Sequence, residues 1–466
     1  MTHYLGRLSS CALVASLATF SSVAADLRLV NAVEKQDKSA VVALLKQHAD
    51  VNARQADGAT ALQWAVHWND LDTVDRLIHA GADVNAANDL GATALYLACR
   101  QANGAMVVKL LAAGANPNSS LPNGETALMT AAATGSIEAA KALVDRGAQV
   151  DARDHDRGQT ALMWAASEQH PEMVRLLIES HADINARSKG GFTPLLFAAR
   201  SGNIESARLL IAAGANINDA APDGSTPLLV ASASEVAIAS KDYKLNVRPS
   251  DHEKLAIFLL ENGADPSKTD ELGRTPLHVA VETGRVELVK ALLAHGANPN
   301  ARMTKNEPPL PGDYAARNGF VGATPFWVAA RASDLKLMNV LVAGGADPNI
   351  PAADGTTPLM VAAGASQTEN RLPPEGQILE AVKLCFQLGN DINAASRSGQ
   401  TAVHVGAAMG EDTIIQFLFE HGAKLDAKDR GGRTALDIAL TNPSRPRPKT
   451  AALLRKLLSE NTSSGQ

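Results

Sequence analysis

Short apolar stretches alternate with polar turns along most of the chain, and the alternation is periodic. A hexamer of the form Thr-Ala/Pro-Leu-x-x-Ala recurs, with successive threonines 33 or 34 residues apart except for three intervals of 49, 49 and 44 residues. Val and Leu residues at helical spacing follow each hexamer, and in most units a Gly-Ala pair comes next. The pattern predicts two short helices per unit. The hexamers begin at Thr60, Thr93, Thr126, Thr160, Thr193, Thr226, Thr275, Thr324, Thr357, Thr401 and Thr434.

The residue types at the ends of these stretches suit helix termini. Thr caps the free amides of a first helical turn, and Pro at the next position loses no hydrogen bond there. Glycine is expected where each second helix ends, in a left-handed conformation, and His48 and His181 replace it at a cost in local stability. Dipeptides such as Asp57-Gly58 and Asn123-Gly124 predict hairpin tips between units. The glycines are Gly81, Gly114, Gly147, Gly214, Gly263, Gly296, Gly345, Gly389 and Gly422.

The hexamer identifies a family resemblance. Thr275-Pro276-Leu277-His278-Val279-Ala280 matches Thr-Pro-Leu-His-x-Ala, and the chain therefore resembles ankyrin-repeat proteins, whose unit is 33 residues long. The resemblance implies an all-α ankyrin-repeat solenoid, built from stacked helix-turn-helix units joined by β-hairpin loops. We expect about twelve repeats over residues 26–466, folding as one domain, with an N-terminal cap at 26–56 and a C-terminal cap at 434–460.

The first 25 residues differ from the repeats. Arg7 precedes an apolar stretch from Leu8 to Phe20, and small residues end it, so cleavage is expected after Ala24 or Ala25. This predicts a signal peptide and a periplasmic or secreted protein, similar to exported bacterial multi-repeat ankyrin proteins. A membrane anchor is the alternative, but the stretch is shorter than the ~20 residues that span a bilayer. Lipidation at Cys11 is a further alternative, although little apolar sequence precedes that residue.

Charge and cysteine content exclude some classes of function. The net charge of -6 is unlike the basic surface of a nucleic-acid binder. After signal cleavage no membrane insertion is expected, and Cys99 and Cys385 remain. They lie nearly nine repeat periods apart, and each repeat contacts only its neighbours, so they cannot form a disulfide.

Catalytic motifs are absent from the sequence. It contains no Gly-rich phosphate loop, no His-Glu-x-x-His and no Gly-x-Ser-x-Gly, so we predict no enzyme, cofactor or metal site. Asp154-His155-Asp156 could hold a metal, but adjacent turn residues seldom converge on one ion. The resemblance implies that His278 and His404 bond to neighbouring loop backbone. Other residues at that position should lose the bond, namely Gln63, Tyr96, Met129, Met163, Leu196, Leu229, Trp327, Met360 and Asp437.

Three insertions interrupt the period, at residues 234–249, 301–322 and 364–376, all between Thr226 and Thr401. They are either tolerated surface loops or a specialised contact surface. The second contains Tyr314 in a Pro-rich segment and is the strongest candidate of the three, because inter-repeat hairpins border the groove of ankyrin folds.

Partner-binding residues are predicted from repeat phase. Ankyrin folds usually meet partners through hairpin tips and the exposed end of each first helix, which here means residues just before each Thr and seven or eight after it. Trp68 and Phe192 are unusual at such positions, although each could instead pack on a neighbouring repeat or hairpin. Trp64, Trp164 and Phe197, four after Thr, are expected to fill the core. The candidates are His67, Trp68, Arg100, Gln101, Phe192, Arg200, Arg274, Arg331 and Tyr314.

These features predict a monomeric, non-catalytic, extracytoplasmic scaffold that binds an unidentified protein through its concave groove and hairpin tips. An alternative is an accessory or protective factor for one enzyme or toxin, such as an immunity or stress-protection protein. A third possibility is an enzyme or small-ligand binder that uses the irregular region 226–401.

Overall fold

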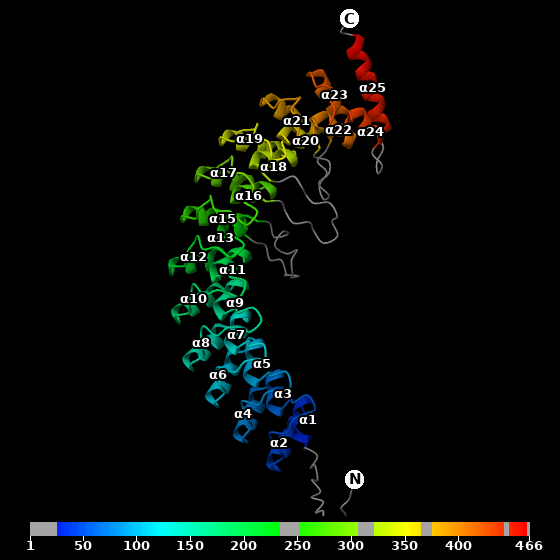
Figure 1. The fold of residues 1–466 in the computed structure, drawn as a ribbon. Helices are drawn as coiled ribbons and strands as arrows, with labels where there is room; N and C mark the ends of the chain where they lie inside the picture. Colours follow the sequence, from blue (N-terminus) through cyan, green and yellow to red (C-terminus); the bar gives the residue numbers. More distant parts are fainter. Residues whose placement is uncertain (1–25, 234–250, 306–320, 365–374, 442–446, 464–466) are drawn as a thin grey trace, which may run out of the picture. The chain divides into compact units, whose positions relative to one another are not determined.

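The computed structural model describes residues 26–233, 251–305, 321–364, 375–441 and 447–463 (Figure 1). The chain divides into two compact units. The N-terminal unit comprises residues 1–98 and 106–116, and the C-terminal unit comprises residues 99–105 and 117–466. The predicted signal peptide and most of the three predicted insertions lie outside the described residues.

The N-terminal unit stacks helix pairs. Helix α1 packs on α2 and α3, and α2 and α3 each pack on α4. Helix α5 begins in this unit and ends in the C-terminal unit. The bounds are α1 Arg28–Glu34, α2 Lys38–Lys46, α3 Ala61–His67, α4 Leu71–His79, α5 Ala94–Arg100 and α6 Gly104–Ala112.

The C-terminal unit repeats this arrangement. The first helix of each repeat packs on its own second helix and on the first helix of the next repeat, so first and second helices form two columns (Figure 1). The helices are α7 Ala127–Thr134, α8 Ile137–Asp145, α9 Ala161–Ser167, α10 Pro171–Glu179, α11 Pro194–Ser201, α12 Ile204–Ala212, α13 Pro227–Ser232, α15 His252–Glu261, α16 Pro276–Glu282, α17 Val286–Ala294, α18 Pro325–Arg331, α19 Leu335–Ala343, α20 Pro358–Ala363, α21 Glu375–Gln387, α22 Ala402–Met409, α23 Asp412–Glu420, α24 Ala435–Thr441 and α25 Pro448–Ser463.

Helix termini follow the sequence pattern closely. The Thr60 and Thr193 side chains accept hydrogen bonds from the backbone N–H three residues on, and Pro194 occupies the first turn of α11. All nine glycines predicted to end second helices have positive φ, between 84° and 99°. His48 and His181 adopt the same conformation, with φ of 57° and 63°, which is unfavourable for a side chain.

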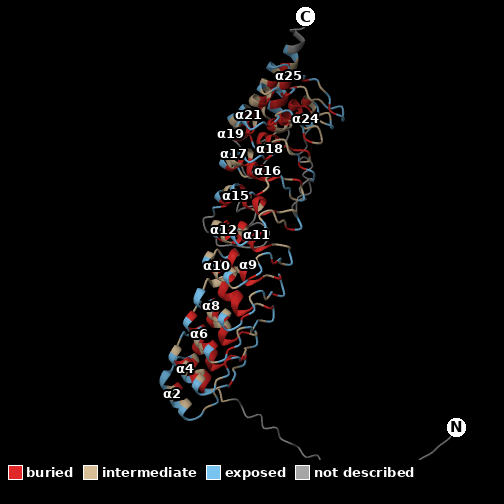
Figure 2. Ribbon diagram, turned by 90° about the vertical axis from the view of Figure 1, so that its left-hand side faces the viewer, coloured by how far each residue is buried: buried red, intermediate tan, exposed pale blue. Residues whose placement is uncertain are grey.

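Burial separates the two faces of the stack. First helices are buried along most of their Leu and Ala residues, with Leu440 of α24 an exposed exception, while second helices bury one stripe and expose their outer side (Figure 2). Phe197 is buried as predicted, but Trp64 and Trp164 are only half-buried. Their large indoles extend beyond the thin layer that the small Ala residues around them define.

The two cysteines lie in the core as free thiols. Burial raises the pKa of both the Cys99 and the Cys385 thiol to about 12. A thiol held in its neutral form is a poor nucleophile, so neither cysteine is suited to redox or covalent chemistry.

Candidate functional site

Six asparagines each join one repeat to the next and limit which polar side chains remain open for binding. In the C-terminal unit, Asn118 Nδ2 donates to the Gly147 carbonyl at 3.1 Å, and its Oδ1 accepts from the Gln149 N–H at 2.7 Å. Because both partners lie at the end of the following second helix, each Asn clamps the next repeat. The other clamps with both bonds are Asn52, Asn85, Asn218, Asn300 and Asn393.

Neighbouring hairpin tips are joined by single backbone bonds. In the C-terminal unit, the N–H of His155 donates to the Asn123 carbonyl at 2.6 Å and that of Glu271 donates to the Asp223 carbonyl at 2.8 Å. Pro222 occupies a donor position in this series and has no N–H to give. The tips are therefore a regular row whose backbone is already engaged, and only their side chains are open to a partner.

In four hexamers the fourth residue anchors the following hairpin. His278 Nε2 lies 3.2 Å from the Ala323 carbonyl and His404 Nε2 lies 3.2 Å from the Arg433 carbonyl, as the family resemblance implies. The predicted loss of this bond is wrong for Gln63 and Trp327. The Gln63 amide donates to the Ala86 and Ala92 carbonyls at 3.0 and 2.8 Å, and the Trp327 indole donates to Thr356 at 3.0 Å. Both side chains carry an N–H at nearly the reach of the imidazole.

The His278 imidazole is held neutral. Burial lowers its pKa to about 4, against the opposing effects of the Ala323 carbonyl and of Asp270. Its Nδ1 lies 3.2 Å from the Thr275 backbone nitrogen, which can only donate a hydrogen bond. The Thr275 hydroxyl also lies 2.9 Å from Nδ1, so the cost of protonating this imidazole comes chiefly from burying its charge.

A further set of side chains satisfies the carbonyls at the ends of first helices, and Trp68 belongs to it. The Trp68 indole donates to the Glu34 carbonyl at 3.1 Å, in the N-terminal unit. In the C-terminal unit His252 Nε2 lies 3.0 Å from the Arg200 carbonyl, and the Arg285 guanidinium donates to the Ala233 carbonyl at 3.0 Å. The alternative to a binding role for Trp68 is packing on the capping repeat. The bond to Glu34 supports that packing, although the side chain remains 40% exposed.

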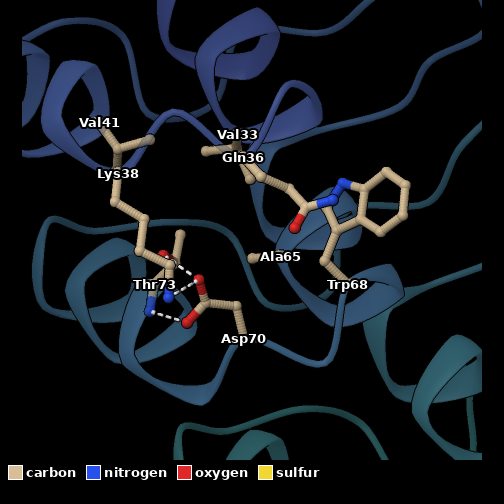
Figure 3. A pocket seen from close by; sticks show the side chains of 8 residues that line it. All are labelled: Val33, Gln36, Lys38, Val41, Ala65, Trp68, Asp70 and Thr73. Carbon is tan, nitrogen blue, oxygen red and sulfur yellow. Dashed lines mark hydrogen bonds and ion pairs between the residues drawn. The ribbon is translucent and has the colours of Figure 1, made fainter.

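Beside Trp68 lies a small hollow between the cap and the next repeat (Figure 3). Lys38 Nζ pairs with Asp70 Oδ2 at 2.9 Å, and Asp70 also accepts from Thr73. Burial acts to raise the pKa of the Asp70 carboxyl, but the bonds from Lys38 and Thr73 outweigh it and lower that pKa. The hollow has room for about one water molecule, and Lys38, Asp70 and Thr73 are paired with one another, so it is poorly suited to a substrate.

An aromatic cluster occupies the first-helix face of the C-terminal unit. The rings of Phe192 and Phe197 lie 5.8 Å apart, and the Arg200 guanidinium lies 5.2 Å from the Phe197 ring centre. Phe192 and Arg200 are half-buried. Trp164, at the position in the preceding repeat that corresponds to Phe197, has a buried indole N–H without an acceptor among the described residues. Phe192 therefore packs within its own repeat and still presents one edge to solvent.

The remaining predicted residues fall into four situations. Arg274 is held by Asp270 at 2.8 Å and Glu282 at 3.4 Å, because its guanidinium reaches both carboxylates. Arg331 is half-buried at the end of α18, while His67, Arg100 and Gln101 are exposed at the ends of α3 and α5. Tyr314 lies outside the described residues. His67 and Trp68 belong to the N-terminal unit, whereas Arg100 and all the later candidates belong to the C-terminal unit.

The described residues contain neither a cluster of metal-ligating side chains nor a helix that could span a membrane. No three His, Cys, Asp or Glu side chains within them converge to hold a metal ion. At Asp154-His155-Asp156, the Asp154 carboxylate is occupied by the backbone N–H groups of Arg157 and Gln159. Across the same ranges no helix combines the length and apolar character needed to span a bilayer.

Comparison with known families agrees with the repeat geometry. The model of three ankyrin repeats matches residues 29–120, 102–188, 247–323 and 374–462, and the single ankyrin-repeat model matches 190–221 and 321–353. The chain belongs to the ankyrin-repeat family, whose repeats are generally non-catalytic interaction modules.

Individual relatives are similar over parts of the chain. An ankyrin repeat protein of fowlpox virus is 26% identical over 192 residues, which is 41% of this chain and 88% of the relative. The human neurogenic locus notch homolog protein 2 is 31% identical over 163 residues, or 35% of this chain and 6% of the relative. The mouse 2-5A-dependent ribonuclease is 47% identical over 53 residues, covering 11% of this chain and 7% of the relative. The last two matches span only a small part of each relative.

Proposed function

We propose that this chain is a non-catalytic, extracytoplasmic scaffold that binds a partner protein through its hairpin tips and the adjoining ends of its first helices. Family membership supports the interaction role, since ankyrin repeats generally bind proteins. The leader-like sequence of residues 1–25 supports export.

One observation carries the proposal. The clamps, tip bonds and anchors engage the polar groups between repeats, whereas the side chains bordering the first-helix face of the C-terminal unit are only partly engaged. The half-buried Phe192 and Trp164, together with Arg200 over the Phe197 ring, give this face the residue types that dominate protein interfaces. An aromatic anchor next to a cation can bury apolar area and bond a partner's carbonyl or carboxylate at the same time.

Photo-crosslinking tests the proposal. A benzoylphenylalanine placed at exposed Glu168 or exposed Arg433 lies on the proposed face, and one at Lys141 of α8 or Lys336 of α19 lies on exposed second helices. We expect Glu168 and Arg433 to crosslink the same protein in cells and the two control positions to give none. Equal crosslinking from both faces, or none from either, would contradict the proposal.

A further inference from the structure

Most cationic side chains on or beside the hairpins are engaged by the fold. Arg54 donates to the Ala87 carbonyl at 3.2 Å, and Arg302 donates to the Pro351 carbonyl at 2.8 Å. Arg187 bonds the Ala220 carbonyl at 3.1 Å and pairs with Asp219. Lys189 bonds the carbonyl of His155 on the neighbouring tip. These cations join adjacent hairpins through hydrogen bonds, so a structural role accounts for them and no binding partner is needed to explain them.

The last two hairpins of the C-terminal unit differ. Residues 396–400 and 428–433 carry four cations, Arg397, Lys428, Arg430 and Arg433, and a single carboxylate, Asp429. Asp429 is buried and pairs with Arg433 at 2.8 Å. Arg397, Lys428 and Arg430 are exposed and form no side-chain hydrogen bond or ion pair within the described residues.

These three cations, which we name the terminal tip patch, lie on adjacent tips. The Arg430 N–H donates to the Ser398 carbonyl at 2.8 Å, so Arg430 follows Arg397 directly along the row. Lys428 lies close enough to Asp437 to help lower the pKa of that carboxyl, though the backbone and hydroxyl of Thr434 act more strongly. Like charges held side by side repel one another, and an acidic partner would relieve that repulsion.

We propose that the terminal tip patch docks an acidic, Asp- or Glu-rich segment of the partner protein. The proposal rests on the proposed function and names the chemistry of the partner. Local positive charge contrasts with the net charge of -6 of the whole chain, so attraction to this patch would orient an approaching acidic segment. None of Arg397, Lys428 and Arg430 has an aromatic neighbour in its hairpin on which a base could stack.

The test uses the full chain and a labelled 16-residue peptide of alternating Glu and Ser. The tip variant carries Arg397→Ala, Lys428→Ala and Arg430→Ala, and keeps the backbone N–H groups that join the tips. The matched control carries Lys141→Ala, Lys336→Ala and Arg455→Ala, which removes the same charge from exposed cations that likewise lack a side-chain bond within the described part of the chain. A Gln-for-Glu peptide, a 16-residue oligo-dT and phosphatidylglycerol vesicles complete the set.

We expect the Glu peptide to bind at low ionic strength and the tip variant to bind it about tenfold more weakly, the size expected from three exposed charge contacts. The control variant should differ from the parent by less than about twofold. Equal binding by the tip variant and the parent, or no binding of the Glu peptide, would overturn the inference. So would oligo-dT or vesicles that bind as tightly through the same three residues. Crosslinking from Glu168 that persists in the tip variant would leave the proposed function standing.

Discussion

At the scale of single residues, His278 shows how a side chain serves the repeat through its protonation state. The imidazole joins the start of α16 to the next hairpin through Nδ1 beside Thr275 and Nε2 beside the Ala323 carbonyl, and burial disfavours its charged form. Its pKa of about 4 lies below the ordinary value of 6.5, so the folded state binds this proton less well than the unfolded chain does. Stability from this residue is therefore present above pH 6.5 and is lost as the pH falls toward 4.

We expect the free energy of unfolding to fall by up to about 3 kcal/mol more in the parent chain than in His278→Gln between pH 7 and pH 4. Gln63 already anchors a hairpin at the equivalent position without titrating, so the Gln variant should remain folded at pH 7. Urea unfolding at several pH values measures this. Parallel curves for the two proteins would show that His278 does not control the acid response.

The left-handed histidines give a second prediction. His181 has a φ of 63° where other repeats have glycine, so His181→Gly should raise stability by about 0.5 to 1 kcal/mol. The reverse change, Gly147→His, is a matched control because a Cβ there meets nothing within 4 Å and only the backbone φ of 84° opposes it. It should lower stability by a similar amount, as read from thermal unfolding; a loss of stability in His181→Gly would contradict the account.

At the scale of the repeat, the sequence predicts the elements well and their connections poorly. Thr caps and terminal glycines were predictable because local backbone geometry restricts the residues allowed there. The Asn clamp was visible as a recurrent Asn, but its two bonds to the next repeat depend on how repeats stack. Likewise, nothing in the phase of Trp68 or Arg274 shows that their polar atoms reach Glu34, Asp270 and Glu282.

The Asn118 clamp can be tested by graded removal. Asn118→Ala loses both inter-repeat bonds and should cost about 1 to 3 kcal/mol. Asn118→Asp keeps the acceptor for the Gln149 N–H and loses only the donor to Gly147, as Asp151 does naturally when it accepts from the Asp183 N–H at 2.8 Å. The Asp variant should therefore fall between the parent and Asn118→Ala in chemical denaturation. Equal stability of all three proteins would show that the clamp contributes little.

At the scale of the whole molecule, both repeat cysteines are buried as free thiols, so the export proposed for this chain would require no disulfide. The full sequence has three cysteines, and cleavage after Ala24 or Ala25 would remove Cys11. We expect the protein recovered from the periplasm to have two thiols that react with an alkylating reagent after denaturation, and none that react quickly when folded, since both lie in the core. Three reactive thiols, with the matching mass, would show that the leader is retained.

A second feature at this scale is which of the predicted binding residues already have partners within the fold. Some predicted binding residues bond to other parts of the fold, as Trp68 and Arg274 do. Others, such as Phe192, remain partly exposed to solvent. This division could not be read from the sequence, because repeat phase gives the position of a side chain and not its partner.

Hydrogen exchange of the chain, with and without the partner identified by crosslinking, tests the central claim most directly. We predict that bound partner slows exchange at the hairpin tips and the ends of first helices in the C-terminal unit and leaves second helices α8, α10 and α12 unchanged. Protection confined to the second helices would contradict the account, because it would place the partner on the opposite column of the stack.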